Sequence, residues 1–350
     1  MVKSVFVNQQ NPALPNLPIG VLKSLWRGAE VVSNRPALLL IPVLLDLFLW
    51  LGPHVGVASL VDPILQFLSQ KQGVTGLSAE ETKAALTSVA SIATHLNLLA
   101  VLAFFPLFPP SVMATRLPLL TPWGQAVLFQ IQSPLGYMAL ILLLSIAGMM
   151  LGSAFWSLVA RALSTPGGAR FEAREWLRVA RNVIVLAIGA GLGAMIVGIP
   201  IVFGVGLVGV SSAILGQILL VLMGGLVLWV LMFFVFSLHG VVLNSESIMR
   251  AMGKSAEVVR WSYPSTLSLV LLSALVLMGT NAVWALPEES SWVGVVGVLG
   301  NAYTSTALVA ASLIFYQDRR RWVEELRRYL ETRARKPQPV VERNGEAKNG

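Results

Sequence analysis

The stretch AILGQILLVLMGGLVLWVLMFFVF, residues 213–236, contains no charged residue. About 20 consecutive apolar residues are enough for a helix to cross the hydrocarbon core of a bilayer. The stretch therefore predicts a membrane-spanning helix, which we place at about 213–240. Because backbone groups in the hydrocarbon region must be bonded within the protein, an apolar segment of this length indicates a helical membrane fold.

The composition of the whole chain is that of a membrane protein. Of its 350 residues, 55% are hydrophobic and only 12% are charged, and the mean hydropathy is +0.74. Soluble domains average about 25% charged residues, so this chain lies well outside their range. We place the other spans at about 36–55, 135–160, 182–208, 264–286 and 292–316. The prediction is an all-α, polytopic transmembrane helical bundle of about six spans within residues 20–316.

The positive charges indicate how the spans are oriented. All but three of the 25 lysines and arginines fall within residues 1–35, 161–181, 244–263 and 317–350. Cytoplasmic loops of membrane proteins are enriched in these residues, so we place all four segments in the cytoplasm. Both termini are then cytoplasmic, and we expect a multi-pass protein of a bacterial inner (plasma) membrane. The long polar start before the first apolar run argues for an uncleaved anchor rather than a signal peptide.

Three segments beside the spans have the pattern of amphipathic helices that lie in the membrane interface. They cover about 20–34, 170–181 and 245–262, with Ser245 as the expected N-cap of the third. A cytoplasmic basic helix at about 318–334 follows the last span and has Trp322, Leu326 and Leu330 on one face. Eight basic side chains of these four segments are expected to bind anionic headgroups on the cytoplasmic side: Lys23, Arg27, Arg174, Arg178, Lys254, Arg319, Arg320 and Arg321. Because these charges lie beside membrane spans, we expect the lipid bilayer rather than nucleic acid as their partner.

Residues 56–133 carry few basic side chains, and we place them on the outer side. Within them, the uninterrupted apolar run of segment 91–113 covers only 98–105 before Pro106. A run this short favours a re-entrant or interfacial segment over a full span. The polar residues 1–19 are expected to be disordered, as is the tail that follows the basic helix within 317–350.

Two parts of the chain share a short motif. Residues 28–32 read GAEVV and residues 255–259 read SAEVV, each with a basic residue just before it and a proline soon after. Residues 175–179 (EWLRV) are a weaker third copy. The repeated unit is an interfacial helix followed by a two-span hairpin. It predicts either simple membrane anchoring or a cytoplasmic collar that binds a protein partner.

This layout, together with GNAYTSTALVAASLIFYQDRR at 300–320, resembles a loose group of uncharacterised bacterial six-span membrane proteins. The group includes the membrane domain attached to some glycerophosphodiester phosphodiesterases. The resemblance implies a six-span membrane domain. The chain has no segment left over for the phosphodiesterase catalytic domain, so the resemblance does not imply that activity.

Asp46 is the one acidic residue within the predicted spans. A carboxylate in the hydrocarbon region is costly and marks a candidate functional site. Because the spans contain no lysine or arginine, we expect Asp46 to be protonated or hydrogen bonded to polar side chains. The candidates are His239, Asn281, Asn301 and Tyr303. Two interpretations remain open, a structural hydrogen-bonding group and a proton or cation site.

The sequence favours a function without catalysis. It contains no Ser-His-Asp order, no paired catalytic carboxylates, no phosphate-binding loop and no cysteine. We therefore expect no enzyme, no cofactor and no metal site. The preferred function is a membrane assembly, scaffold or lipid-interacting component with a protein partner at helix 318–334. The alternative is a small-molecule or ion transporter, or a permease subunit, that uses Asp46 and a third span broken at Gly198 and Pro200.

Overall fold

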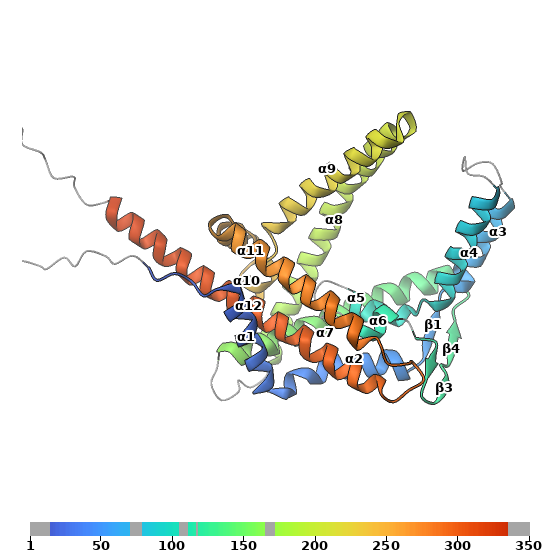
Figure 1. Cartoon of the computed structure of the whole chain (residues 1–350), viewed down its shortest axis with the longest axis horizontal. Helices are drawn as coiled ribbons and strands as arrows, with labels where there is room; N and C mark the ends of the chain where they lie inside the picture. The colour runs from blue at the N-terminus through green and yellow to red at the C-terminus, as the bar shows by residue number, and fades with distance from the viewer. Residues whose placement is uncertain (1–14, 71–78, 105–110, 117, 165–171, 335–350) are drawn as a thin grey trace, which may run out of the picture.

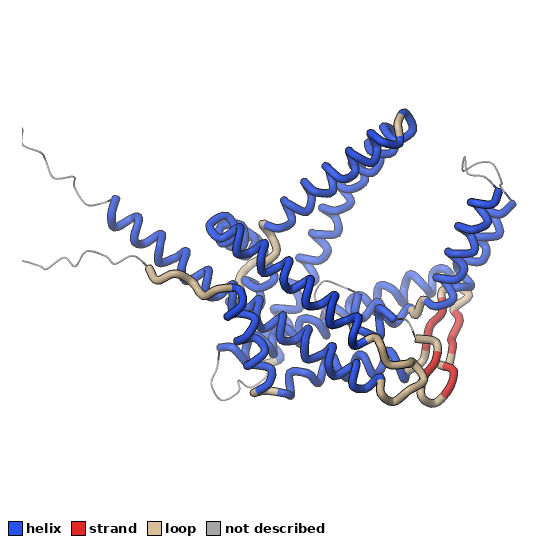
Figure 2. Tube along the Cα trace, viewed as in Figure 1, coloured by secondary structure: helices blue, strands red, loops and turns tan. Residues whose placement is uncertain are grey.

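The computed structural model describes residues 15–70, 79–104, 111–116, 118–164 and 172–334. Figure 2 shows that these parts form an all-α bundle with only short strands, as predicted. Five helical segments are long and apolar enough to cross a membrane: α7 (Pro134–Ser164), α8 (Ala173–Ser211), α9 with α10 (Ala213–Asn244), α11 (Ile248–Trp284) and α12 (Gly294–Ala334). A sixth is formed if α1 (Val21–Ser33) and Pro36–Leu51, which meet at 95°, count as one broken span.

Helix α12 lies at the centre of the bundle. Helices α1, α2 (Leu40–Leu51), α7 and α11 all pack against it (Figure 1). Its residues Ala310, Leu313 and Phe315 are fully buried. Ala310 and Leu313 belong to an apolar core that also contains Val32 of α1 and Val159 of α7. The last span is therefore the element against which most of the others are positioned.

Helix α1 is packed against α12 through small residues. Its buried residues Ser24, Gly28 and Val32 are spaced four apart and so lie on one face. A Cβ at Gly28 would lie 2.7 Å from the Cβ of Ala311, so the absence of a side chain allows the two helices to approach this closely. The predicted interfacial helix is therefore part of the bundle along one face.

The chain turns sharply between α1 and α2. Proline has no N–H to continue the hydrogen bonding of a helix, and Pro36 begins the short 3-10 helix η1 (Pro36–Leu39). Helix α2 follows directly and ends at Leu51. The helical part of the first span is thus shorter than the predicted 36–55.

Helices α8 and α9 form a two-helix arm that projects from the bundle (Figure 1). Their most apolar stretches have no buried residues within the protein. Helix α8 runs without interruption through Gly198 and Pro200, so the predicted break in the third span is wrong. It also begins at Ala173, so residues 173–181 of the predicted interfacial segment are the first part of the same helix.

The chain returns from the arm through α9 (Ala213–Met232), a turn and α10 (Ser237–Asn244). Ser245 has a positive φ of 50° and ends α10. The prediction that it caps the next helix is wrong, because that N-cap is Ser247. Helix α11 is kinked at Ser262, two residues before Pro264, as prolines in long helices commonly cause. The kink lies where the predicted interfacial part meets the predicted span.

The predicted basic helix at 318–334 is helical and continues α12 without a break. This part of α12 also hydrogen bonds to the backbone near the start of the described chain. The Ile19 amide donates to Asp318 Oδ2 at 2.7 Å, and Arg319 donates to the Ile19 carbonyl at 3.0 Å. These two hydrogen bonds hold Ile19, the last residue of the predicted disordered segment 1–19, against α12. Residues 1–14 and 335–350 lie outside the described residues.

The described residues between α2 and α7 form the end of the bundle opposite Ile19 and the last turns of α12, which we name the far end (Figure 1). Helices α3 (Ala58–Gln70) and α4 (Ala79–His95) pack together there as a hairpin. Strand β1 (His54–Gly56) pairs in parallel with β4 (Leu128–Gln130). Strands β2 (Leu120–Thr121) and β3 (Gly124–Gln125) form a small antiparallel hairpin.

The predicted re-entrant or interfacial segment 91–113 is divided into short pieces. After α4 come η2 (Leu98–Ala100), α5 (Val101–Phe104) and α6 (Val112–Arg116), and residues 105–110 lie outside the described ranges. Helix α5 packs closely on α7, where a Cβ at Gly148 would lie 2.7 Å from the Leu102 carbonyl oxygen. The described helices of this segment are too short to span a membrane, and its position relative to the bilayer stays a prediction.

Candidate functional site

The Asp46 carboxylate is buried where three parts of the chain meet. Asp46 as a whole is 1% exposed to solvent. The Ser111 hydroxyl and the Met113 amide, the latter at 3.3 Å, both donate to Asp46 Oδ1. The Asn301 side chain of α12 also hydrogen bonds to this carboxylate. Asp46 thus links α2 to α12 and to the start of α6.

Helix α2 presents Asp46 inward because its neighbours along the helix are apolar and buried. Leu45, Leu49 and Trp50 lie in the core between α2, the short helices and α7. Asp46 follows Leu45 on the same side of the helix and must therefore find its partners inside the protein. A buried carboxylate without donors would be strongly destabilising, so the hydrogen bonds are a condition for this packing.

The donors to Asp46 come from the beginning of α6. The first amides of a helix have no acceptor within the helix, and Asp46 accepts the one of Met113. Ser111 caps the same helix, since its Oγ also accepts the Ala114 amide at 2.9 Å. The geometry is that of a carboxylate completing a helix cap. This arrangement is compatible with structural hydrogen bonding, one of the two interpretations left open by the sequence.

The five residues of the predicted polar site do not meet at one place in the structure. Of the four predicted partners of Asp46, Asn301 reaches it. Tyr303 instead shares a hydrogen bond with Ser33 at 2.9 Å and bonds to the Ala29 carbonyl at 3.3 Å, which joins α12 to α1. Asn281 lies on α11, and within the described residues no hydrogen bond connects it to Asp46.

Sequence reasoning missed Ser111 and Met113 as partners of Asp46. They lie more than 60 positions away, and the contact depends on how α6 docks onto α2. One local signal was available. A serine directly before a short helical segment is typical of an N-cap, so Ser111 could have been identified as the start of a helix.

His239, the fourth predicted partner, lies in an aromatic cluster on α10. The ring centroids of Trp156, Phe236 and Tyr316 are 5.2, 5.0 and 5.6 Å from that of its imidazole. Its Nε2 shares a hydrogen bond with Ser312 Oγ at 2.9 Å. The His239 side chain therefore joins α10 to α7 and α12 by ring packing and one hydrogen bond.

A charged network lies beside this cluster and was not predicted. Arg320 of α12 forms ion pairs with Glu246 at 2.7 Å and with Glu324 at 3.2 Å. Asn182 of α8 donates to the Glu246 carbonyl at 3.3 Å. The pairing of Arg320 with Glu324 follows from their i, i+4 spacing. Glu246 is 74 positions away, and only the fold brings it to Arg320.

The predicted headgroup-binding residues differ in their exposure and in their contacts. Five of them are exposed, namely Lys23, Arg27, Arg174, Arg178 and Arg321. Lys254 is partly buried and pairs with Glu257 at 3.2 Å. Arg319 and Arg320 make contacts within the bundle, and headgroup binding by either stays a prediction. Arg319 lies 4.7 Å above the Phe315 ring, and Arg320 holds the charged network.

A groove of about 540 Å³ runs between the first part of α11 and the last part of α12. We name it the α11–α12 groove. Its apolar lining includes Phe233, Trp261, Val323, Leu326 and Leu330. Its charged lining consists of Glu257, Arg260, Arg327 and Glu331, and Arg327 pairs with Glu257. A surface with an apolar floor and charges of both signs at its edges suits an amphipathic helix.

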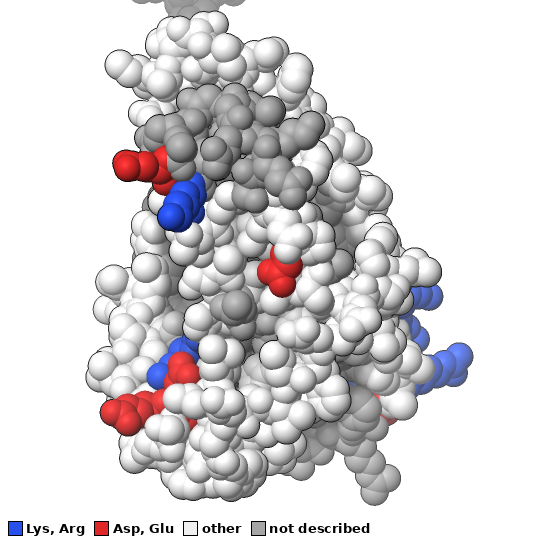
Figure 3. All heavy atoms as spheres, turned by 90° about the vertical axis from the view of Figure 1, so that its right-hand side faces the viewer, with Lys and Arg blue, Asp and Glu red and all other residues white. Residues whose placement is uncertain are grey.

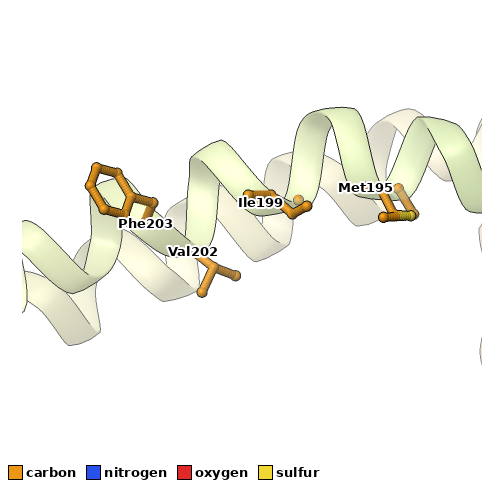
Figure 4. A pocket seen from close by; sticks show the side chains of 6 residues that line it. Met195, Ile199, Val202 and Phe203 are labelled. Atoms are coloured by element: carbon orange, nitrogen blue, oxygen red, sulfur yellow. The ribbon is translucent and has the colours of Figure 1, made fainter.

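A second, shallow hollow lies on α8 and is wholly apolar. Figure 4 shows Met195, Ile199, Val202 and Phe203 along it, and Gly198 leaves the space between them. These residues belong to the projecting arm, and the hollow offers no polar group for chemistry. Its surface matches the acyl chains that surround a membrane-spanning helix.

The described residues contain no group of three His, Asp or Glu side chains arranged to hold a metal ion. Comparison of the chain with protein-family models, with curated proteins and with solved structures found no match. The function must therefore be argued from the arrangement of its own residues.

Proposed function

We propose that the protein is a non-catalytic component of a bacterial inner membrane that assembles other molecules at its cytoplasmic face. The α11–α12 groove is the observation that carries this proposal. It lies at the end of the bundle from which both described chain ends emerge (Figure 1). The described parts of the basic segments, which the charge pattern assigns to the cytoplasm, lie toward the same end (Figure 1).

The groove suits a protein partner better than a small molecule. Trp261 and Leu330 are both about half exposed, and large half-exposed apolar side chains of this kind commonly anchor a partner. Arg260 is exposed beside them and supplies a charge for pairing at the rim. The partner that fits is an amphipathic helix whose apolar face covers Trp261 and Leu330 and whose acidic residues meet Arg260.

Contact with lipid supports the same role. On α1, Leu22 and Trp26 are largely exposed and alternate with the exposed Lys23 and Arg27. Apolar side chains that reach the acyl region beside basic ones that reach headgroups are typical of an interfacial anchor. The exposed face of α1 would thus bind anionic lipid while its other face packs on α12.

A photoreactive amino acid at Leu330, irradiated in native membranes, tests the groove. We expect a discrete protein adduct from position 330 that disappears when Trp261 is replaced by glutamate. Leu17, which is 88% exposed but outside the groove, is the matched control and should give no such adduct. Adducts with lipid alone from position 330 would contradict a protein partner at this site.

The sidedness on which the proposal rests can be measured separately, because the chain has no cysteine. Single cysteines at the exposed positions Ser164 and Thr332 should resist a membrane-impermeant thiol reagent applied to intact cells. Cysteines at Ser91 and Ser290, also exposed, should react. Labelling at 164 from outside would overturn the assignment of the basic segments to the cytoplasm.

Transport is the second candidate, and the convergence of Ser111 and Asn301 on Asp46 is the observation that favours it. A proton or cation site requires that the carboxylate be reached by water. The burial of Asp46 and the unbroken α8 both support the non-transporting alternative. Proton flux into proteoliposomes decides between them, since flux that is lost in Asp46→Asn would establish transport.

A further inference from the structure

The far end of the bundle exposes several large apolar side chains. We name them the far-end apolar surface, which consists of Leu120, Trp123, Val127, Phe129, Leu286 and Trp292. Trp123, at the tip of the β2–β3 hairpin, is 71% exposed, and Trp292 is 51% exposed. Large apolar side chains left exposed together, as the touching rings of Trp123 and Trp292 are, mark contact with a membrane or with another protein.

The chain segment that contributes four of these six residues carries no charged side chain, and the charges beside the surface are those of Glu288 and Glu289, between Leu286 and Trp292. No lysine, arginine, aspartate or glutamate occurs between Arg116 and Arg161, a stretch that includes the β2–β3 hairpin and β4. Figure 3 looks onto the far end and shows only a few charged side chains on a largely uncharged surface. A loop that is fully in water normally carries charged residues to remain soluble. The composition of this segment is therefore that of a surface removed from bulk water.

Contacts between tryptophan rings connect the far-end apolar surface to the end of α2 and the start of α12. Trp292 lies two residues before α12 begins, and its ring centroid is 5.3 Å from that of Trp123. Trp50, at the end of α2, is 6.2 Å from Trp292 and donates its indole N–H to the Glu289 carbonyl at 3.1 Å. Tryptophan is enriched at the level where membrane spans end, where the ring contacts acyl chains and the N–H remains hydrated.

We propose that the far-end apolar surface lies in the interfacial region of the bilayer leaflet at the far end, with Trp123 and Val127 in contact with lipid. The charge pattern makes this leaflet the outer one. Trp123 lies beside Trp292, whose ring contacts Trp50, near the ends of α12 and α2. A side chain at the end of a membrane-spanning helix is level with the lipid headgroups, so its neighbours in the membrane are lipids. This position favours lipid over a protein partner. The β2–β3 hairpin then acts as an outer anchor that complements the basic anchor of α1.

Single-cysteine variants labelled with an environment-sensitive fluorophore test the proposal in the full chain. Trp123→Cys and Val127→Cys, each reconstituted in vesicles of phosphatidylethanolamine and phosphatidylglycerol, are the test positions. Ser88→Cys, on the exposed side of α4, is the matched control. We expect blue-shifted emission at 123 and 127, strong quenching by lipids with a nitroxide near the headgroup, and weak quenching by aqueous iodide. The control should show the opposite pattern.

Two test positions keep the result decisive if the loss of the Trp123 ring disturbs the hairpin, because Val127 leaves the tryptophan contacts in place. Lipid quenching at 127 with wild-type thermal stability supports the proposal even if the variant at 123 is unstable. Iodide quenching at 127 equal to that at 88 would overturn it. The far-end apolar surface would then face water and would be a surface for a protein partner instead.

Discussion

Gly28 of α1 lies directly against Ala311 of α12, so close that a Cβ on the glycine would be 2.7 Å from the Cβ of the alanine. This contact sits in the most extensive helix pairing of the bundle. The same position of the repeated motif is occupied by Ser255 in α11, which is also fully buried. In both copies the fifth residue, Val32 or Val259, is buried as well. The two copies of the motif therefore have the same pattern of burial, in which a small first residue and a valine at the fifth position face the interior.

Replacing Gly28 by valine should force α1 away from α12 and lower the free energy of unfolding by about 1–3 kcal/mol, the usual cost of overpacking. The thermal unfolding midpoint of the purified protein in detergent measures this. Gly253→Ala is the control, since a Cβ there meets open space on helix α11. That variant should be neutral or more stable by about 0.5–1 kcal/mol. Equal midpoints for Gly28→Val and the wild type would show that the close approach is not required.

Replacing Asp46 by alanine should leave the Ser111 hydroxyl and the Met113 amide without their acceptor and destabilise the protein by about 1–3 kcal/mol. The loss should release α6, so that trypsin cleaves after Arg116 faster than in the wild type. Asp62→Ala, at an exposed position, should change stability by no more than about 0.5 kcal/mol. Ser111→Ala combined with Asp46→Ala should cost less than the sum of the two, because both changes break one contact.

Arg320 and Arg321 are neighbours in sequence with opposite roles. Arg320→Ala should destabilise the protein by about 1–3 kcal/mol, since it leaves the nearly buried Glu246 carboxylate without its charged partner. Arg321 is exposed, and Arg321→Ala should leave the unfolding midpoint unchanged. Binding to vesicles that contain anionic lipid should show the reverse order, with the larger loss for Arg321→Ala. Equal stability of the two variants would contradict the assignment of Arg320 to an internal network.

Stability should depend on pH through His54, which is buried in β1 at the far end. Burial lowers the pKa of His54 below its usual value, and the backbone of Pro118 acts weakly in the opposite direction. The unfolded chain, with a histidine pKa of about 6.5, therefore binds a proton more readily than the folded chain does. The contribution of His54 to stability is complete above about pH 6.5 and decreases as the pH falls below that value.

His54→Leu should reduce the difference between the unfolding midpoints measured at about pH 8 and about pH 5, because it removes a group that titrates with folding. Ser88→Leu is the control, since Ser88 is exposed on α4 and its hydroxyl does not titrate between these pH values, so the pH dependence should stay intact. A pH dependence that is unchanged in His54→Leu would mean that other groups cause it.

The spans were predictable because their signal is local. A helix such as α9 needs only a long run of apolar residues, since lipid or protein can cover any of its faces. The turn at Pro36 and the kink before Pro264 were equally local, because proline removes a helix donor wherever it stands. Composition alone was misleading for α8, where Gly198 and Pro200 are accommodated in a continuous helix.

The partners of the polar residues were decided by the tertiary structure. The sequence by itself determined that Asp46 needs hydrogen bonds, but not that Ser111 provides one, because the docking of α6 onto α2 brings the two together. It likewise determined that 319–321 is basic, but not which side chains face inward. On a helix, successive residues point about 100° apart, so the positions of α1 and the α10–α11 turn around α12 select Arg319 and Arg320 for the interior and leave Arg321 outside.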